Sequence, residues 1–351
     1  MPDVKEVYEM VTKQKPPQPG ALERQLGRQR RAGRNRKVGA IAVAAALVVG
    51  LVTIALVSDP GRSGLPRNNV SPPVPINATP PIGAQIVALD GTVLQQLPPA
   101  VVADSGFAVS PDGQTVAFYD AGKVETARLD GTEVRVLTEP STGGGDGCCT
   151  ISWSPDGSRI AYARNDEIFV MNADGSDQRQ LTHSPAGSGS YWPAWSPTSD
   201  TIAFWRGSFT PDDGGPSDAE IYTIPASGGA ATRLTQDNVP SIEPAWSPDG
   251  SQIVYRRSRK QDLVVMQADG TNAHRLPGRV QNPWAPSWSR DGTKIAYLAC
   301  CTEVGSPPLL EVQVFDLHTR TVQRLHMDVA TDGGGPAVWL DDGRLLVERY
   351  D

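Results

Sequence analysis

Six variants of the motif WSPDG recur between residues 107 and 343, and a repeat of this kind leaves few folds open to the chain. They read FAVSPDG, ISWSPDG, PAWSPTSD, PAWSPDG, PSWSRDG and AVWLDDG. Their turn positions are Gly113, Gly157, Asp200, Gly250, Gly292 and Gly343, which lie 44, 43, 50, 42 and 51 residues apart. Propeller blades repeat about every 40 to 45 residues, so the spacing predicts six similar sheets in a ring.

A second signature follows five of the six motifs, for example VMNADGSDQRQLT at residues 170–182. It combines an alternating apolar segment, a DG turn and an ending of the type R-L-T. Together the two signatures supply four short strands to each unit, the WSPDG part forming the inner ones. One extra copy, IVALDGTVLQQL at 86–97, stands ahead of the first WSPDG motif.

This extra copy predicts how the ring closes. The last unit, AVWLDDGRLLVERYD at 337–351, provides only inner strands, while residues 86–97 provide only outer ones. The two ends are therefore expected to meet in one composite blade, because a closed ring leaves no exposed sheet edge. The expected fold class is all-β: a six-bladed β-propeller over residues 84–351, with N- and C-terminal strands closing one blade.

The residues of the motif have structural explanations. Proline fixes φ in the turn, aspartate bonds its own backbone two residues on, and glycine adopts positive φ. Most carboxylates of the chain belong to such turns. A large ring buries most area between adjacent sheets, which is where five aligned tryptophans are expected: Trp153, Trp195, Trp246, Trp288 and Trp339. The first blade has Val109 instead and should pack more loosely.

The succession W-S-P-D-G, then I-A-Y or I-A-F, then D-G and R-L-T resembles the WD-repeat-like units of TolB-type six-bladed propellers. The resemblance covers about residues 84–351 and implies an extracytoplasmic propeller that binds partners. Members of that family carry a separate N-terminal α/β domain and are soluble. Here a predicted membrane anchor takes the place of that domain.

Residues 38–58 (VGAIAVAAALVVGLVTIALVS) contain no charge over 21 positions, enough for a helix to cross a hydrocarbon core about 30 Å thick. The alternatives are a buried core helix, although the segment has no polar face, and a signal peptide, although its apolar region is long. Residues 1–37 hold 10 basic and 4 acidic residues, which places this tail in the cytoplasm. Residues 59–83 are proline-rich and predict an extended linker. We expect a single-pass protein of the cell membrane with the propeller outside the cytoplasm.

The charge balance and the motifs exclude several functions. The net charge is −7 and the tail carries +6, so the other residues carry −13, which disfavours nucleic-acid binding. No nucleophile elbow, phosphate loop, dinucleotide fingerprint or CxxC zinc spacing occurs. We expect a non-catalytic binding or sensing module without cofactor or metal. The alternatives are a hydrolase or lyase with its site in the axial channel, and an envelope scaffold.

All long connections are expected on one face of the ring, called here the long-loop face. Function on propellers sits in variable loops, so this face is the predicted surface for a protein partner or for a small ligand, a sugar or a peptide. Neutral loop variation is the alternative. The connections are 138–150, 183–192, 207–219, 236–243, 300–310 and 328–336.

The position four residues before each blade tryptophan should lie at the channel mouth. This places Cys149, Tyr191, Ile242 and Trp284 in a mostly apolar rim that suits a sugar ring or a peptide side chain. A plug at the top of the channel is the alternative. The predicted ligand-binding residues are Asp146, Cys148, Cys149, Tyr191, Trp192, Ile242, Glu243, Trp284, Cys300 and Cys301.

Two pairs of adjacent cysteines, Cys148–Cys149 and Cys300–Cys301, fall on this face in opposite blades. Thiols outside the cytoplasm tend to be oxidised. A bridge needs Cα atoms within about 7 Å, so a vicinal disulfide inside each pair is the preferred expectation. Pairing of the two loops across the channel, free thiols and a metal site remain open.

Overall fold

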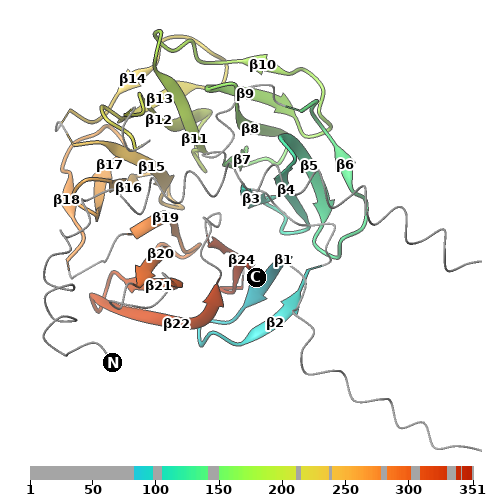
Figure 1. Ribbon diagram of the computed structural model, residues 1–351, viewed down its shortest axis with the longest axis vertical. Coiled ribbons are helices and arrows are strands. Elements are labelled where there is room, and N and C mark those ends of the chain that lie inside the picture. The colour runs from blue at the N-terminus through green and yellow to red at the C-terminus, as the bar shows by residue number, and fades with distance from the viewer. Residues whose placement is uncertain are drawn as a thin grey trace, which may run out of the picture. The chain divides into compact units, whose positions relative to one another are not determined.

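The computed structural model describes residues 83–97, 105–140, 150–210, 215–236, 239–277, 283–301, 309–329, 337–340 and 342–349. They form six antiparallel four-stranded sheets arranged as the blades of a ring (Figure 1). The chain divides into two units, and the ring lies in the unit made of Thr79–Phe209 and Pro216–Asp351. The other unit is made of Met1–Ala78 and Thr210–Gly215. Of its residues, the structure describes Thr210 and Gly215.

The predicted tail, transmembrane helix and linker lie outside the described residues, apart from Gly83, which begins the first strand. Within the described ranges, no helix has the length and apolar character that crossing a membrane requires. The anchor therefore stays a prediction from the sequence.

Five blades consist of four consecutive strands, from the axis outward, as the two repeated signatures predict. Blade one is β3 (Ser105–Val109), β4 (Thr115–Asp120), β5 (Lys123–Arg128) and β6 (Arg135–Val136); blade two is β7 (Ile151–Trp153), β8 (Arg159–Arg164), β9 (Glu167–Asn172) and β10 (Arg179–Gln180); blade three is β11 (Gly189–Trp195), β12 (Thr201–Gly207), β13 (Glu220–Pro225) and β14 (Thr232–Arg233); blade four is β15 (Ser241–Trp246), β16 (Gln252–Arg257), β17 (Asp262–Gln267) and β18 (His274–Arg275); blade five is β19 (Pro283–Trp288), β20 (Lys294–Cys301), β21 (Leu309–Asp316) and β22 (Thr321–Val329).

The sixth blade is the predicted composite. Its order from the axis is β23 (Val338–Trp339), β24 (Leu345–Arg349), β1 (Gly83–Val87) and β2 (Val93–Gln96). Strand β1 runs antiparallel to β24, with Gln85 opposite Val347, and Figure 1 shows the two side by side. Strands from both ends of the chain therefore close the ring, which confirms the prediction.

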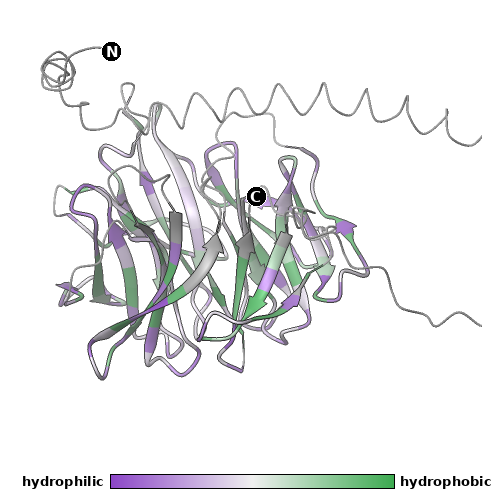
Figure 2. Ribbon diagram, turned by 60° about the horizontal axis from the view of Figure 1, so that its bottom comes forward, coloured by the Kyte–Doolittle hydropathy of each residue, from purple (hydrophilic) through white to green (hydrophobic). Residues whose placement is uncertain are grey.

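The core lies between neighbouring sheets. In β8, which reads RIAYAR, the four central residues are all buried, because both faces of a blade are covered by its neighbours. Figure 2 shows hydrophobic residues along the middle strands and hydrophilic ones at many turns. The joint between the composite blade and blade one is an example, where Ile86 and Leu346 pack in one cluster with Phe107 and Phe118.

The WSPDG turns hold their aspartates as predicted. In blade two, the Ser154 hydroxyl donates to Asp156 Oδ1 at 2.6 Å, and the same oxygen accepts the N–H of Ser158 at 3.0 Å. The Ser154 hydroxyl also accepts the N–H of Arg159 at 2.9 Å. The hydrogen bond from Ser154 is the main cause that lowers the pKa of Asp156 to about 2. This carboxylate is therefore ionised and committed to the turn.

Four of the aligned tryptophans also tie neighbouring blades together through a hydrogen bond that the sequence did not suggest. Each indole N–H donates to a backbone carbonyl oxygen in the preceding blade. The acceptor residue comes directly before the aligned tryptophan of that preceding blade, or before the residue that takes its place in blade one. The bonds run from Trp153 to Ala108 (3.0 Å), from Trp246 to Ala194 (3.0 Å), from Trp288 to Ala245 (3.2 Å) and from Trp339 to Ser287 (3.3 Å).

Trp195 is the exception. Its ring is buried beneath the guanidinium of Arg159, 4.8 Å from the ring centroid, and Arg159 is paired with Asp200 at 2.8 Å. The Trp195 indole nitrogen has no hydrogen-bond partner among the described residues.

This difference predicts unequal effects of one isosteric change. Replacing tryptophan by benzothienylalanine exchanges the indole N–H for sulfur and keeps the shape of the ring. At position 246 it should lower the free energy of unfolding by about 1 kcal/mol, because the Ala194 carbonyl loses its donor. At position 195 the same exchange should cost nothing. Urea unfolding of both variants measures this, and equal losses would contradict the assignment.

The inner strands carry a bulge in blades one, three, four and five. Their pairing with the second strand shifts register near Gly106, Trp192, Glu243 and Ala285, and all four residues have positive φ, between 50° and 59°. In three blades a proline follows, which has no N–H to offer to the ladder. The bulge redirects the chain at the level where the predicted rim residues lie.

Candidate functional site

The predicted site residues divide into three groups. Asp146, Cys148 and Cys149 lie outside the described residues. Cys300 and Cys301 belong to β20, where their backbones pair with Leu310 and Leu309 of β21. The disulfide arrangement therefore stays a prediction. The remaining five, Tyr191, Trp192, Ile242, Glu243 and Trp284, lie on the inner strands of blades three, four and five.

Tyr191 and Ile242 are core residues and do not form an open rim. The Tyr191 ring contacts Trp205 with 4.5 Å between centroids, and its hydroxyl donates to Asp166 Oδ1 at 2.9 Å. Ile242 is buried in the same cluster between blades three and four. Equal spacing from the blade tryptophan thus does not give equal exposure.

Glu243, Arg256 and Trp284 form a connected cluster between blades four and five, called here the tryptophan platform. Glu243 Oε1 accepts from Arg256 Nη1 at 3.2 Å, and Glu243 Oε2 accepts the backbone N–H of Ala285 at 2.7 Å. The Arg256 guanidinium lies 3.8 Å from the centroid of the Trp284 ring. Both charged side chains are buried, whereas Trp284 keeps 38% of its surface exposed.

The platform lies on the long-loop face. Arg256 stands near the end of β16 that is remote from the WSPDG turn, and Trp284 is near the start of β19, just after the connection between two blades. Burial raises the pKa of Glu243, and the nearby Arg256 acts in the opposite direction. A buried cation that is fixed by a carboxylate holds the indole by a cation–π contact. The exposed surface of the Trp284 indole is therefore a fixed aromatic platform.

A cavity of about 900 Å³ occupies the axis on the side of the WSPDG turns. The turn prolines Pro111, Pro155, Pro197 and Pro248 contribute to its lining, and blade five places Arg290 at the equivalent position. Two lining carboxylates are already engaged, because Asp112 accepts from Ser110 and Asp342 accepts from Arg344. The binding surface predicted from the sequence lies on the opposite face, and the axial channel was predicted only as the site of the alternative enzyme. The repeated prolines could have indicated the cavity on this side.

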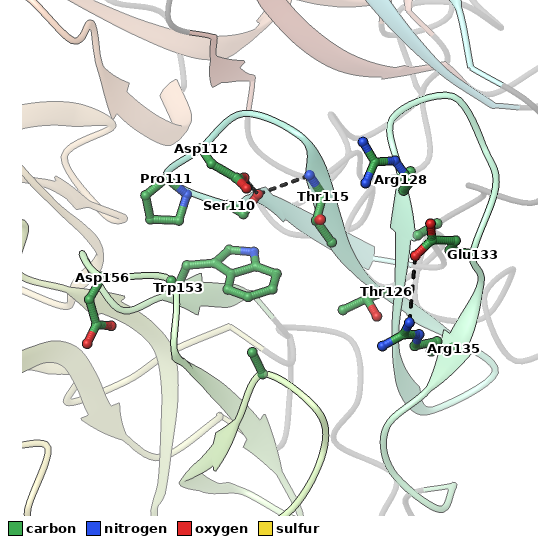
Figure 3. A pocket seen from close by; sticks show the side chains of 13 residues that line it. Ser110, Pro111, Asp112, Thr115, Thr126, Arg128, Glu133, Arg135, Trp153 and Asp156 are labelled. Carbon is green, nitrogen blue, oxygen red and sulfur yellow. Dashed lines mark hydrogen bonds and ion pairs between the residues drawn. The ribbon is translucent and has the colours of Figure 1, made fainter.

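A groove of about 530 Å³ separates blades one and two beside Trp153 (Figure 3). Thr115 lines it, where blade two has the long Arg159 at the equivalent position. Its arginines have partners, since Arg128 donates to Gln114 Oε1 at 2.9 Å and Arg135 lies 3.6 Å from Glu133. Of the residues that the structure describes, no group of three His, Cys, Asp or Glu side chains could hold a metal ion.

The family model of the PD40 TolB beta propeller domain matches residues 108–267. An uncharacterized protein of Agrobacterium fabrum is 27% identical over 143 residues, which are 39% of this chain and 46% of the relative. The chain thus matches less than half the length of that relative.

Solved structures give the same fold. The structure of a putative TolB from Agrobacterium tumefaciens has a TM-score of 0.60 at 23% identity and covers 77% of this chain and 98% of its own. An oligogalacturonate lyase in complex with manganese has a TM-score of 0.53 at 17% identity, over 77% of this chain and 79% of its own. At these identities the likeness shows the fold alone. The described residues form a six-bladed β-propeller, and residues 108–267 of it match the TolB beta propeller model.

Proposed function

We propose that this chain is a membrane-anchored extracytoplasmic propeller that binds a protein partner or a small ligand on its long-loop face and catalyses no reaction itself. The observation that carries the proposal is the tryptophan platform. An exposed indole that stays in place on a buried ion pair costs little entropy to engage, and tryptophan is enriched among residues that dominate binding energy.

The chemistry of the platform indicates what it can bind. The free side of an indole offers a flat apolar surface, which suits the C–H face of a sugar ring or an apolar peptide side chain. The buried Arg256 beneath it fixes the ring without presenting its charge to solvent. Specific recognition would then come from polar groups around the platform.

Capture from native membranes tests this role. The full chain should retain a set of partners that Trp284→Ala loses, because the alanine removes the exposed ring. Val136→Ala is the matched control, since Val136 is an exposed apolar residue on β6 of blade one. A partner set that both variants retain, or that both lose, would argue against the platform.

The topology of the proposal has its own test. A reporter fused after Asp351 should be active only outside the cytoplasm, because the basic residues before position 38 hold the N-terminus inside. A phosphatase that needs disulfides and a fluorescent protein that folds in the cytoplasm give opposite signals. A fluorescent fusion in the cytoplasm would overturn the assigned orientation.

The alternative, a hydrolase or lyase in the axial channel, has one observation in its favour. The cavity of about 900 Å³ lies within the range of small-molecule sites, about 300 to 1,000 Å³. Such an enzyme needs two or more ionisable groups free to act on the substrate. The carboxylates Asp112 and Asp342 of the described lining are instead held by Ser110 and Arg344.

A further inference from the structure

Two arginines of blade two cross the joint to blade three. Arg159 places its guanidinium 4.8 Å from the centroid of the Trp195 ring and pairs with Asp200 at 2.8 Å. Arg179 donates to the backbone carbonyl oxygen of Ala226 at 2.6 Å. The two side chains fill this joint, and Trp195 is only 6% exposed. The chain thus uses an arginine on a tryptophan to pack its own blades.

The joint between blades one and two is not filled in this way. Thr115 stands at the position of the first arginine, and a threonine is too short to cover the ring of Trp153, which is only partly buried. Arg135 stands at the position of the second arginine, but it lies 3.6 Å from Glu133 of its own blade. The groove of about 530 Å³ in Figure 3 lies where the two arginines would be.

The groove offers hydrogen-bond acceptors beside the tryptophan ring. Thr126 is 5% exposed and lines the groove, where Figure 3 shows it across from Trp153, and its hydroxyl makes no hydrogen bond among the described residues. This hydroxyl is not fully enclosed, unlike that of Thr150, so a group in the groove can contact it. Ala173 stands at the position of Ala226 and also lines the groove. No donor within the described residues reaches the carbonyl oxygen of Ala173.

The charges of the groove favour a cation. Its lining holds three carboxylates and two guanidinium groups, those of Asp112, Glu133 and Asp156 and those of Arg128 and Arg135. Hydrogen bonds from serine hydroxyls lower the pKa of Asp112 and that of Asp156, so both carboxylates stay ionised. Both arginines already have partners in blade one. One negative charge of the lining is therefore left without a positive counterpart.

We propose that the groove between blades one and two binds an arginine side chain of a protein partner. The guanidinium lies on the Trp153 ring, in the way that Arg159 lies on Trp195. Its N–H groups donate to the Thr126 hydroxyl and to the Ala173 carbonyl oxygen. A lysine fits less well, because its ammonium is compact and strongly hydrated and does not stack on a ring. The groove is on the side of the WSPDG turns, opposite the long-loop face, so the site does not depend on the tryptophan platform.

The test uses the full chain in detergent, with 5-fluorotryptophan in place of tryptophan so that ¹⁹F NMR reports on each ring. The variant Trp153→Phe identifies the Trp153 resonance. The probes are the N-acetyl amides of arginine, citrulline, lysine and glutamate, of which citrulline has the shape of arginine without its charge. The arginine probe should shift the Trp153 resonance, and each of the other three should bind at least about tenfold more weakly.

Thr115→Arg should abolish binding of the arginine probe, because the chain then fills the groove with an arginine of its own. Thr201→Arg is the matched control, since it adds the same charge at the equivalent position of blade three, outside the groove, and should leave binding unchanged.

Thr126→Val tests the hydroxyl. It gives blade one the residue that blade two has at this position, Val170, so the chain should fold like the parent and bind the arginine probe about tenfold more weakly. Four results would overturn the proposal: the arginine probe leaves the Trp153 resonance in place, Thr115→Arg and Thr201→Arg have equal effects on binding, Thr126→Val keeps the affinity of the parent chain, or any other probe binds as tightly as arginine.

Discussion

Deletion of residues 84–97 is expected to abolish cooperative folding of the propeller. The deletion removes β2 and nearly all of β1, and so exposes the edge of β24. It also removes Ile86, Val87 and Leu97, which are buried against neighbouring blades. Burial of each such side chain contributes about 1.5 to 3 kcal/mol. Their sum is comparable to the whole stability of a typical domain, about 5 to 15 kcal/mol.

Urea unfolding followed by tryptophan fluorescence measures this effect. The truncated chain should show no cooperative transition, whereas the parent chain should show one. The matched control is the double variant Val93→Ser, Leu94→Ser, which alters β2 only where it is about half exposed (49% and 50%) and should leave the transition in place. A truncated chain with the parent midpoint and slope would show that the composite blade does not hold the ring closed.

The fold could be predicted from the sequence because its determinants are local and repeated. A turn such as Ser154–Gly157 and an apolar run such as that of β8 carry their own signals, and their period fixes the number of blades. Closure followed from counting strands at the two ends. The tryptophan positions between sheets were also predictable, since few places can bury so large a ring.

The candidate site was predicted less well, because it depends on how blades meet. The rim residues were placed by spacing alone, but the inner-strand bulge lies between them and the tryptophans, and Tyr191 and Ile242 are buried. Arg256 was missed entirely. Its signal was present in QIVYRR, where an arginine interrupts the apolar run that RIAYAR and TIAFWR continue. A charge at such a position requires a buried partner, and here it is Glu243.

Glu243→Ala is expected to lower the free energy of unfolding by about 3 to 5 kcal/mol, the range for breaking a buried ion pair from one side. The substitution leaves the Arg256 guanidinium buried without its carboxylate and deprives the Ala285 N–H of its acceptor. Glu243→Gln should cost less, because an amide oxygen can still accept the Ala285 N–H. Urea unfolding of the two variants measures how much free energy of unfolding each substitution loses.

A double variant separates the pair from the packing. Replacing a buried ion pair by apolar groups of similar volume is often close to neutral, so Glu243→Met with Arg256→Met should be more stable than Glu243→Ala alone. Methionine sulfur can also contact the Trp284 ring in place of the guanidinium. If the double variant loses as much free energy of unfolding as the two single substitutions lose together, the two charges do not depend on each other. Trp284 would then owe its position to the strand β19 alone, and the buried pair would have no part in holding the platform.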